Sequence, residues 1–196
     1  LFDIVQFTKN DWRNRNKIKT HQGVQWLTIP VQQKRLEQTI AETQVQNGLW
    51  AKKHLKTLQA NYAKAPYYAA YAPRLQQWYA QAAEMSHLSQ INRLFLQHII
   101  QELGLKVEMR ESSEFALEAG KNERLISMCH ALGADRYLSG GAARGYLDEA
   151  RFAQEGITVE WMQYEGYPEY EQLHPPFTHG VSVLDLDAFA PEMLPE

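Results

Sequence analysis

The stretch most suggestive of chemistry is ADRYLSGGAARGYLDEA, residues 134–150, in which two adjacent glycines separate a predicted strand from a predicted helix. Gly140 and Gly141 follow the run Arg136–Ser139, and a helix-like pattern resumes a few residues later. Glycine permits close backbone approach, and the first N–H groups of a helix favour an anion. Together with the Ser139 hydroxyl, they predict a phosphate or carboxylate cradle. Because the GxGxxG motif is incomplete, a turn that needs glycine only for its geometry is the alternative.

A second stretch, FTKNDWRNRNKIKT at residues 7–20, interleaves basic residues with an indole and asparagines. Guanidinium groups bind phosphate or carboxylate through paired hydrogen bonds, and an indole can stack on a sugar or a base. A solvated basic loop is the alternative for each residue. The predicted ligand-binding residues here are Lys9, Trp12, Arg15 and Asn16, of which Arg15 and Asn16 are favoured.

Histidine and carboxylate side chains supply the candidate proton carriers. His174 lies in a proline-containing segment, YPEYEQLHPPFTHGVSVLDLDAF at residues 167–189, where loop placement suits acid or base chemistry. Asp185, in the same segment, is the second predicted catalytic residue. His54 lies on or beside the apolar face of a predicted helix and is a candidate ligand-binding residue, although such a histidine is more often structural.

The sequence has no motif typical of a metal or nucleotide-phosphate site. It contains no HExxH, paired-cysteine, P-loop or GxSxG motif, so we predict no metal and no cofactor. Cys129 is the only cysteine, which excludes an internal disulfide. Its helical spacing with neighbouring apolar residues predicts a buried position rather than a nucleophile.

Composition predicts a globular protein, and the candidate anion-binding residues indicate a small-molecule partner. Of 196 residues, 44% are hydrophobic and 22% charged, which excludes a disordered or collagen-like chain. The net charge of -3 argues against nucleic acid or an anionic membrane as partner. No apolar run is long enough to span a bilayer and no signal peptide is recognisable, so we expect a cytoplasmic protein. Leu1 falls inside a predicted strand, so we expect the start of the natural protein to be missing from this sequence.

The elements that must position these residues alternate between strand and helix around a helical middle. Helical spacing of apolar residues predicts a helical layer or cap over residues 49–103. Further helices are expected from Asn122 to Gly133 and up to Gly156. Strands are expected at residues 1–7, 24–31, 39–45, 105–110, 136–139 and 157–164.

This alternation predicts a three-layer α/β domain with a mainly parallel, Rossmann-like sheet. The carboxyl ends of parallel strands lie at one edge of a sheet, where ligands bind. We therefore expect Lys9, Arg15 or Asn16 within about 10–12 Å of the Gly140 backbone, a span that one ligand could bridge.

Several stretches, in order, resemble the WbqC-like family of bacterial proteins. They are DIVQFTKNDWRNRNKIKT, WLTIPV, WAKKHLKTLQANYAKAPYY, NERLISMCHALGADRYLSGGAARGYLDE with its Tyr146, and the 167–189 segment. The resemblance covers almost the whole chain and implies a single domain over residues 1–196. Such proteins are associated with surface polysaccharide and O-antigen gene clusters.

Two functions follow from this resemblance as expectations. The first is a transferase acting on an amino-sugar nucleotide or a related phosphorylated sugar, with Tyr146 among its ligand-binding residues. The second is a non-catalytic protein of the same pathway that binds a nucleotide sugar or serves as a scaffold. The second needs the same anion-binding groups but not His174, so a substitution of His174 separates the two. A nucleic-acid role is the weakest expectation, because basic and aromatic residues cluster only at 7–20.

Overall fold

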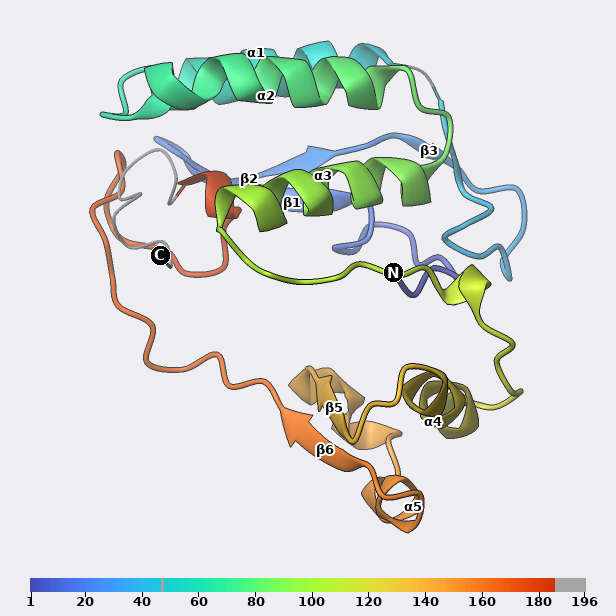
Figure 1. The fold of residues 1–196 in the computed structure, drawn as a ribbon. Coiled ribbons are helices and arrows are strands. Elements are labelled where there is room, and N and C mark those ends of the chain that lie inside the picture. Colours follow the sequence, from blue (N-terminus) through green and yellow to red (C-terminus); the bar gives the residue numbers. More distant parts are fainter. Residues whose placement is uncertain (47, 186–196) are drawn as a thin grey trace. The chain divides into compact units, whose positions relative to one another are not determined.

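The computed structural model describes residues 1–46 and 48–185, and these fold into two compact units (Figure 1). Of the described residues, the larger unit comprises 3–46, 48–109 and 169–185. The smaller unit comprises Leu1–Phe2 and Arg110–Pro168. Each unit has its own cluster of buried apolar side chains, as expected of a compact unit with its own core.

The larger unit contains two antiparallel strand pairs. The strands β1 (Arg15–Thr20) and β2 (Gly23–Thr28) form a hairpin in which Lys17 lies opposite Trp26. Gly23 has φ +104° at the turn, a conformation that favours glycine. The strands β3 (Val31–Gln32) and β4 (Gln44–Val45) form a second, shorter pair.

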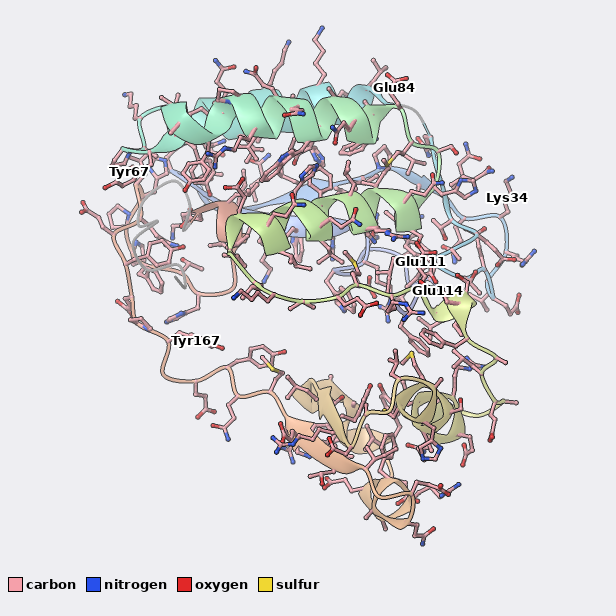
Figure 2. The ribbon with its side chains drawn as sticks, in the orientation of Figure 1. Lys34, Tyr67, Glu84, Glu111, Glu114 and Tyr167 are labelled. Carbon is pink, nitrogen blue, oxygen red and sulfur yellow. The ribbon has the colours of Figure 1, made fainter. Side chains whose placement is uncertain are left out.

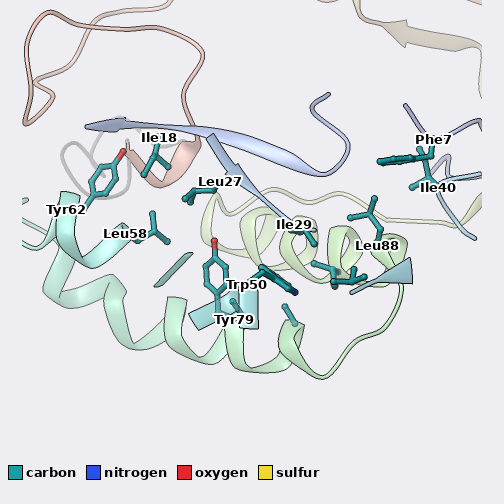
Figure 3. Packing of buried hydrophobic residues seen from close by; sticks show 14 of the residues in the cluster. Phe7, Ile18, Leu27, Ile29, Ile40, Trp50, Leu58, Tyr62, Tyr79 and Leu88 are labelled. Carbon is teal, nitrogen blue, oxygen red and sulfur yellow. The ribbon is translucent and has the colours of Figure 1, made fainter. Parts of the chain in front are cut away.

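Three helices follow in the larger unit: α1 (Leu49–Tyr62), α2 (Tyr68–Ala83) and α3 (Leu88–Glu102). They confirm the predicted helical stretch, because each carries apolar residues at helical spacing that face a core. Figure 3 shows Ile18 and Leu27 of the hairpin on the side of Leu58 and Tyr79 of the helices. The fully buried residues of this core include Phe7, Ile18, Leu58, Leu88 and Ile91.

The smaller unit is built from short elements. They are the 3₁₀ helices η1 (Ser112–Glu114) and η2 (Gly141–Gly145), the helices α4 (Lys121–Ala131) and α5 (Glu149–Gln154), and the strands β5 (Arg136–Ser139) and β6 (Thr158–Trp161). β5 and β6 pair in parallel, with η2 and α5 between them in the chain. The buried core is Leu125, Ile126, Cys129, Ala143, Leu147, Phe152 and Ile157. The predicted burial of Cys129 is confirmed, and burial raises the pKa of its thiol.

The mixed α/β composition and the parallel pairing after residue 136 are confirmed, but a single, mainly parallel sheet is absent from the described residues. Their strands form three separate two-stranded sheets, two of them antiparallel. Residues 105–110 form no strand, and within residues 1–7 only Gln6 makes a bridge, to Thr39. The apolar side chains of 105–110 include Val107, which is exposed, so this run has no buried face to hold it in a sheet. That the chain is a single domain stays a prediction.

Candidate ligand-binding site

Three of the basic residues of the 7–20 stretch lie on one face of the β1–β2 hairpin. Because side chains alternate along a strand, Arg15, Lys17 and Lys19 share one face, and Ile18 points to the core on the other. The guanidinium carbon of Arg15 lies 4.0 Å from the centre of the Trp26 ring, and the Lys17 Nζ lies 5.1 Å from it. Arg15, Lys17 and Trp26 are called the hairpin face below.

The cations of the hairpin face have no carboxylate partner among the residues that the structure describes. Arg13, by contrast, pairs with Asp11. In addition, the Nε groups of Arg13 and Arg15 and the Oδ1 of Asn14 are buried without a hydrogen-bond partner. Buried polar groups are normally paired, so three such atoms in consecutive residues indicate a place where a polar ligand could complete the bonding.

The other predicted residues of this stretch lie around the hairpin face. Lys9 is exposed in a turn, and Trp12 is 76% exposed with the Arg13 guanidinium over its ring. Asn16 accepts a hydrogen bond from the Lys17 N–H, and strand alternation places it on the opposite face from Arg15. The two residues that the sequence favoured most therefore do not share a face.

The outer edge of β1 is closed by side chains and loop backbone rather than by another strand. The Ser182 N–H donates to the Lys17 carbonyl at 2.8 Å, and the Lys19 N–H donates to the Tyr62 hydroxyl at 3.0 Å. These bonds satisfy backbone groups that an edge strand would otherwise leave open. They also hold the segment that contains His174 and Asp185 along β1.

Lys19 is buried, and its ammonium group is bonded to the same segment. Its Nζ donates to the Pro176 carbonyl at 2.5 Å and to the Thr178 hydroxyl at 2.6 Å. The Thr178 N–H in turn donates to the side-chain carbonyl of Gln172. A buried ammonium group is stable only where its donors are matched in this way.

Asp185 accepts hydrogen bonds from three side chains and is only 1% exposed. The donors are the Tyr62 hydroxyl at 2.7 Å, the Tyr170 hydroxyl at 2.6 Å and the Gln172 amide at 2.9 Å. Burial, and secondly the charge of Asp185, raise the pKa of Tyr62 well above its usual value, so its hydroxyl remains a donor. These contacts favour a positioning role for Asp185; its predicted catalytic role stays a prediction. Lys19, Tyr62, Tyr170, Gln172, Thr178 and Asp185 are called the polar knot below.

His174 is half-buried at the end of the hairpin. Its ring centre lies 6.0 Å from that of His21, which sits in the turn between β1 and β2, and the two rings meet edge to face. His179, five residues further on, is exposed and packs edge-on against Phe177. His174 therefore lies at the turn end of the hairpin, in the segment that bonds to Lys17 and Lys19 of β1.

Packing contacts explain the position of the His54 side chain. Its ring meets Trp50 and Tyr79 edge to face, and its Nε2 donates to the Thr28 carbonyl at 3.0 Å. Burial lowers its pKa, which keeps the ring neutral. These contacts favour the structural alternative over ligand binding.

The predicted glycine loop belongs to the smaller unit. Ser139 is buried and hydrogen-bonds with Tyr137, and Gly140 has an ordinary extended conformation at φ −73°, ψ 148°. A Cβ on Gly141 would meet nothing within 4 Å. The geometry of the turn therefore does not require these glycines, whereas η2, with five residues, is too short to act as a helix terminus for an anion. A ligand-binding role of the loop stays a prediction.

The expected convergence of Lys9, Arg15 or Asn16 with Gly140 also stays a prediction. Its premise was that residues 1–7 and 136–139 are parallel strands of one sheet. That premise is wrong, because within residues 1–7 only Gln6 makes a bridge, to Thr39, and among the described residues β5 pairs with β6 alone.

Sequence reasoning missed several residues of this region. The roles of Trp26 and Lys17 could have been predicted, because a period-two pattern across a hairpin predicts which side chains share a face. The polar knot could not have been predicted, because nothing in the sequence shows that a lysine and an aspartate more than a hundred residues apart are both buried.

The part of the chain that the structure describes, residues 1–46 and 48–185, holds neither a metal-binding cluster nor a membrane-spanning helix. No group of three or more His, Cys, Asp or Glu side chains there could hold a metal ion. None of the described helices is both long enough and apolar enough to cross a membrane.

Comparison with known proteins gives one family and one close relative. Residues 1–192 match the WbqC-like protein family. An uncharacterised protein of Mycobacterium tuberculosis, Rv1507c, is 43% identical over 187 residues, which cover 95% of this chain and 80% of the relative. No solved structure matches the sequence.

Proposed function

Because the chain belongs to the WbqC-like protein family, we propose that it is a transferase of bacterial surface polysaccharide biosynthesis that binds a nucleotide sugar, or a related phosphorylated sugar, on its hairpin face. The association of similar proteins with O-antigen gene clusters supports the substrate class. The observation that carries the proposal is the pair of cations over Trp26 without a carboxylate partner in the described chain.

The chemistry of the hairpin face fits a phosphorylated sugar. Arg15 and Lys17 lie two residues apart on one strand, about 7 Å along it, a spacing that suits two oxygens of one phosphate or a diphosphate. The indole of Trp26 is 39% exposed and offers an apolar surface to a sugar or a base. The unpartnered Nε–H groups of Arg13 and Arg15 add donors for phosphate oxygens.

His174 is the proposed proton carrier. In a transfer reaction the attacking hydroxyl or amine loses a proton, and an imidazole is suited to accept it near neutral pH. The half-buried ring lies beside the hairpin turn, and the polar knot fixes its segment to β1. Asp185 acts in this proposal through that knot, as a positioning residue.

Thermal shift with a panel of nucleotide sugars tests binding. A ligand at 100 times its Kd stabilises the folded protein by about 2.7 kcal/mol, which gives a clear shift. We expect the double substitution Arg15→Gln and Lys17→Gln to abolish it, and the control Lys53→Gln, an exposed lysine on α1, to leave it intact. A panel without any hit, or a hit that both variants retain, contradicts the proposal.

The non-catalytic alternative is favoured by one observation: the His174 ring has no hydrogen-bond partner among the described residues to fix its tautomer. His174→Ala decides between the two. An enzyme loses turnover while the ligand Kd stays within about tenfold, or about 1.4 kcal/mol. His179→Ala is the matched control, because it removes a histidine from the same segment. Equal turnover in both variants favours the binding protein.

A further inference from the structure

The smaller unit gathers cations and aromatic rings around the carboxyl ends of its two parallel strands. Arg144, in η2, lies with its guanidinium carbon 4.4 Å from the centre of the Trp161 ring at the end of β6. Lys121, at the start of α4, has its Nζ 5.4 Å from the centre of the Tyr146 ring. A Cβ added to Gly140 would lie 3.7 Å from the Tyr164 hydroxyl, so that ring adjoins the same loop.

We propose that these residues form a second binding site, for an anionic saccharide, within the smaller unit. Arg144 and Tyr146 lie within residues 139–146, and Lys121, Trp161 and Tyr164 adjoin that loop. These five residues are called the strand-end site below. The site does not depend on a helix terminus, because its charge comes from two side chains.

The cations of the strand-end site differ from other cations of the same unit. Arg110 pairs with Glu114 at 2.5 Å, Arg136 with Glu160 at 3.3 Å and Arg151 with Glu155 at 2.6 Å (Figure 2 labels Glu114). Lys121 and Arg144 lie over aromatic rings instead. Neither has a carboxylate partner in the described part of the chain. Two positive charges that form no ion pair, at one loop, favour an anionic ligand.

The aromatic rings indicate a ligand that has an apolar surface as well as an anionic group. Tyr146 is 51% and Tyr164 66% exposed, which is unusual for two large rings at one loop. The Trp161 Nε1 donates to Glu149, which fixes the indole with a face toward Arg144. Aromatic faces favour the apolar C–H faces of a sugar ring, so a saccharide with an anionic group matches both features.

A side chain outside the loop 139–146 fixes the conformation of that loop. The Asn122 amide donates to the Tyr146 carbonyl at 3.3 Å, and its Oδ1 accepts from the Asp148 N–H at 3.0 Å. Preorganisation of this kind lowers the entropy cost of binding.

Fluorine NMR of the full chain labelled with 5-fluorotryptophan tests the two sites separately. Trp161 reports on the strand-end site and Trp26 on the hairpin face, with each resonance assigned by a Trp→Phe substitution. The probe is glucose 1-phosphate, compared with glucose and with inorganic phosphate. We expect the Trp161 resonance to shift saturably, with an affinity at least tenfold higher for glucose 1-phosphate than for either fragment.

Arg144→Gln and Lys121→Gln should each weaken this response at least tenfold. Arg136→Gln, which removes an ion-paired arginine from the same unit, should leave it within twofold. The response should also survive Arg15→Gln with Lys17→Gln, so failure of the hairpin face and failure of the strand-end site are distinguishable. A Trp161 resonance that does not move at about 10 mM probe, or equal losses in Arg144→Gln and Arg136→Gln, overturns the proposal.

Discussion

The hairpin face and the strand-end site use the same chemistry on different supports. In both, two cations lie over aromatic rings, and neither pair has a carboxylate partner in the described residues. The hairpin face is backed by the polar knot, whose buried charges join β1, α1 and the chain after Glu169. The strand-end site is backed by short elements and by one asparagine.

The two sites draw their rigidity from different sources. A buried network in which each group is satisfied fixes one arrangement strongly, and loss of one member leaves several others unpaired. A site on short local elements depends instead on the small core beneath it. The hairpin face should therefore respond most to polar substitutions and the strand-end site most to apolar ones.

The largest effect is expected from Phe152→Ala in the core of the smaller unit. Phe152 is fully buried and its ring meets Tyr137 at 5.4 Å, so truncation should lower the free energy of unfolding by about 3–5 kcal/mol. Urea denaturation followed by circular dichroism measures the loss. The control Leu138→Ala, on the exposed side of β5, should cost less than about 1 kcal/mol.

The same variant sharpens the comparison when the fluorine resonances are followed. We expect Phe152→Ala to abolish the Trp161 response to glucose 1-phosphate while Trp26 still responds to a nucleotide sugar. Loss of both responses would contradict separate supports for the two sites.

Asp185→Ala should have the next largest effect, through the polar knot. It leaves the Tyr62 and Tyr170 hydroxyls and the Gln172 amide without their shared acceptor, so we expect a loss of about 3 kcal/mol. Asp135→Ala, at an exposed aspartate, is the control and should change stability by less than about 0.5 kcal/mol. If both variants unfold at the same urea concentration, the polar knot does not support the hairpin face.

Local patterns in the sequence predicted local structure well. The strand over 136–139 has the predicted bounds, and the predicted helical stretch 49–103 contains α1, α2 and α3, because these segments carry a clear period of apolar residues or a glycine stop. The prediction of a strand at residues 105–110 was wrong, because β-branched and apolar residues do not form a strand without a partner strand.

The candidate site was harder to predict because its key contacts span the chain. Lys19 reads as a solvated lysine in the sequence, yet it is buried by residues more than 150 positions away. Asn122 reads as a helix cap, but the N-cap of α4 is Gly120 and Asn122 bonds to residues 146 and 148 instead. Residue types and local spacing were a better guide to the functional residues than to the contacts between them.

A smaller effect is expected from pH, through His54. Because burial lowers its pKa in the folded state, the unfolded chain binds more protons at His54 below its ordinary value of 6.5. The stability that the neutral ring contributes is therefore present above that value and is lost as pH falls through the lowered folded-state pKa. Urea midpoints at pH 7.5 and 5 should differ more in the wild type than in His54→Gln. Equal differences would show that His54 is not held neutral.

The smallest effect on stability, and the most direct comparison of the two regions, is expected from Gly141→Val. At Gly141 a side chain meets nothing within 4 Å and φ is not positive, so the free energy of unfolding should change by less than about 0.5 kcal/mol. Gly23→Val is the matched control in the hairpin turn, where φ +104° should make the same substitution cost about 1–3 kcal/mol.

Ligand binding to Gly141→Val then distinguishes a ligand-binding loop from a connecting loop. If a phosphorylated sugar approaches the backbone at Gly141, the valine should weaken glucose 1-phosphate binding by about a kcal/mol or more, roughly fivefold, in calorimetry of the folded variant. Unchanged affinity in Gly141→Val would confine the ligand contacts of the smaller unit to the side chains of the strand-end site.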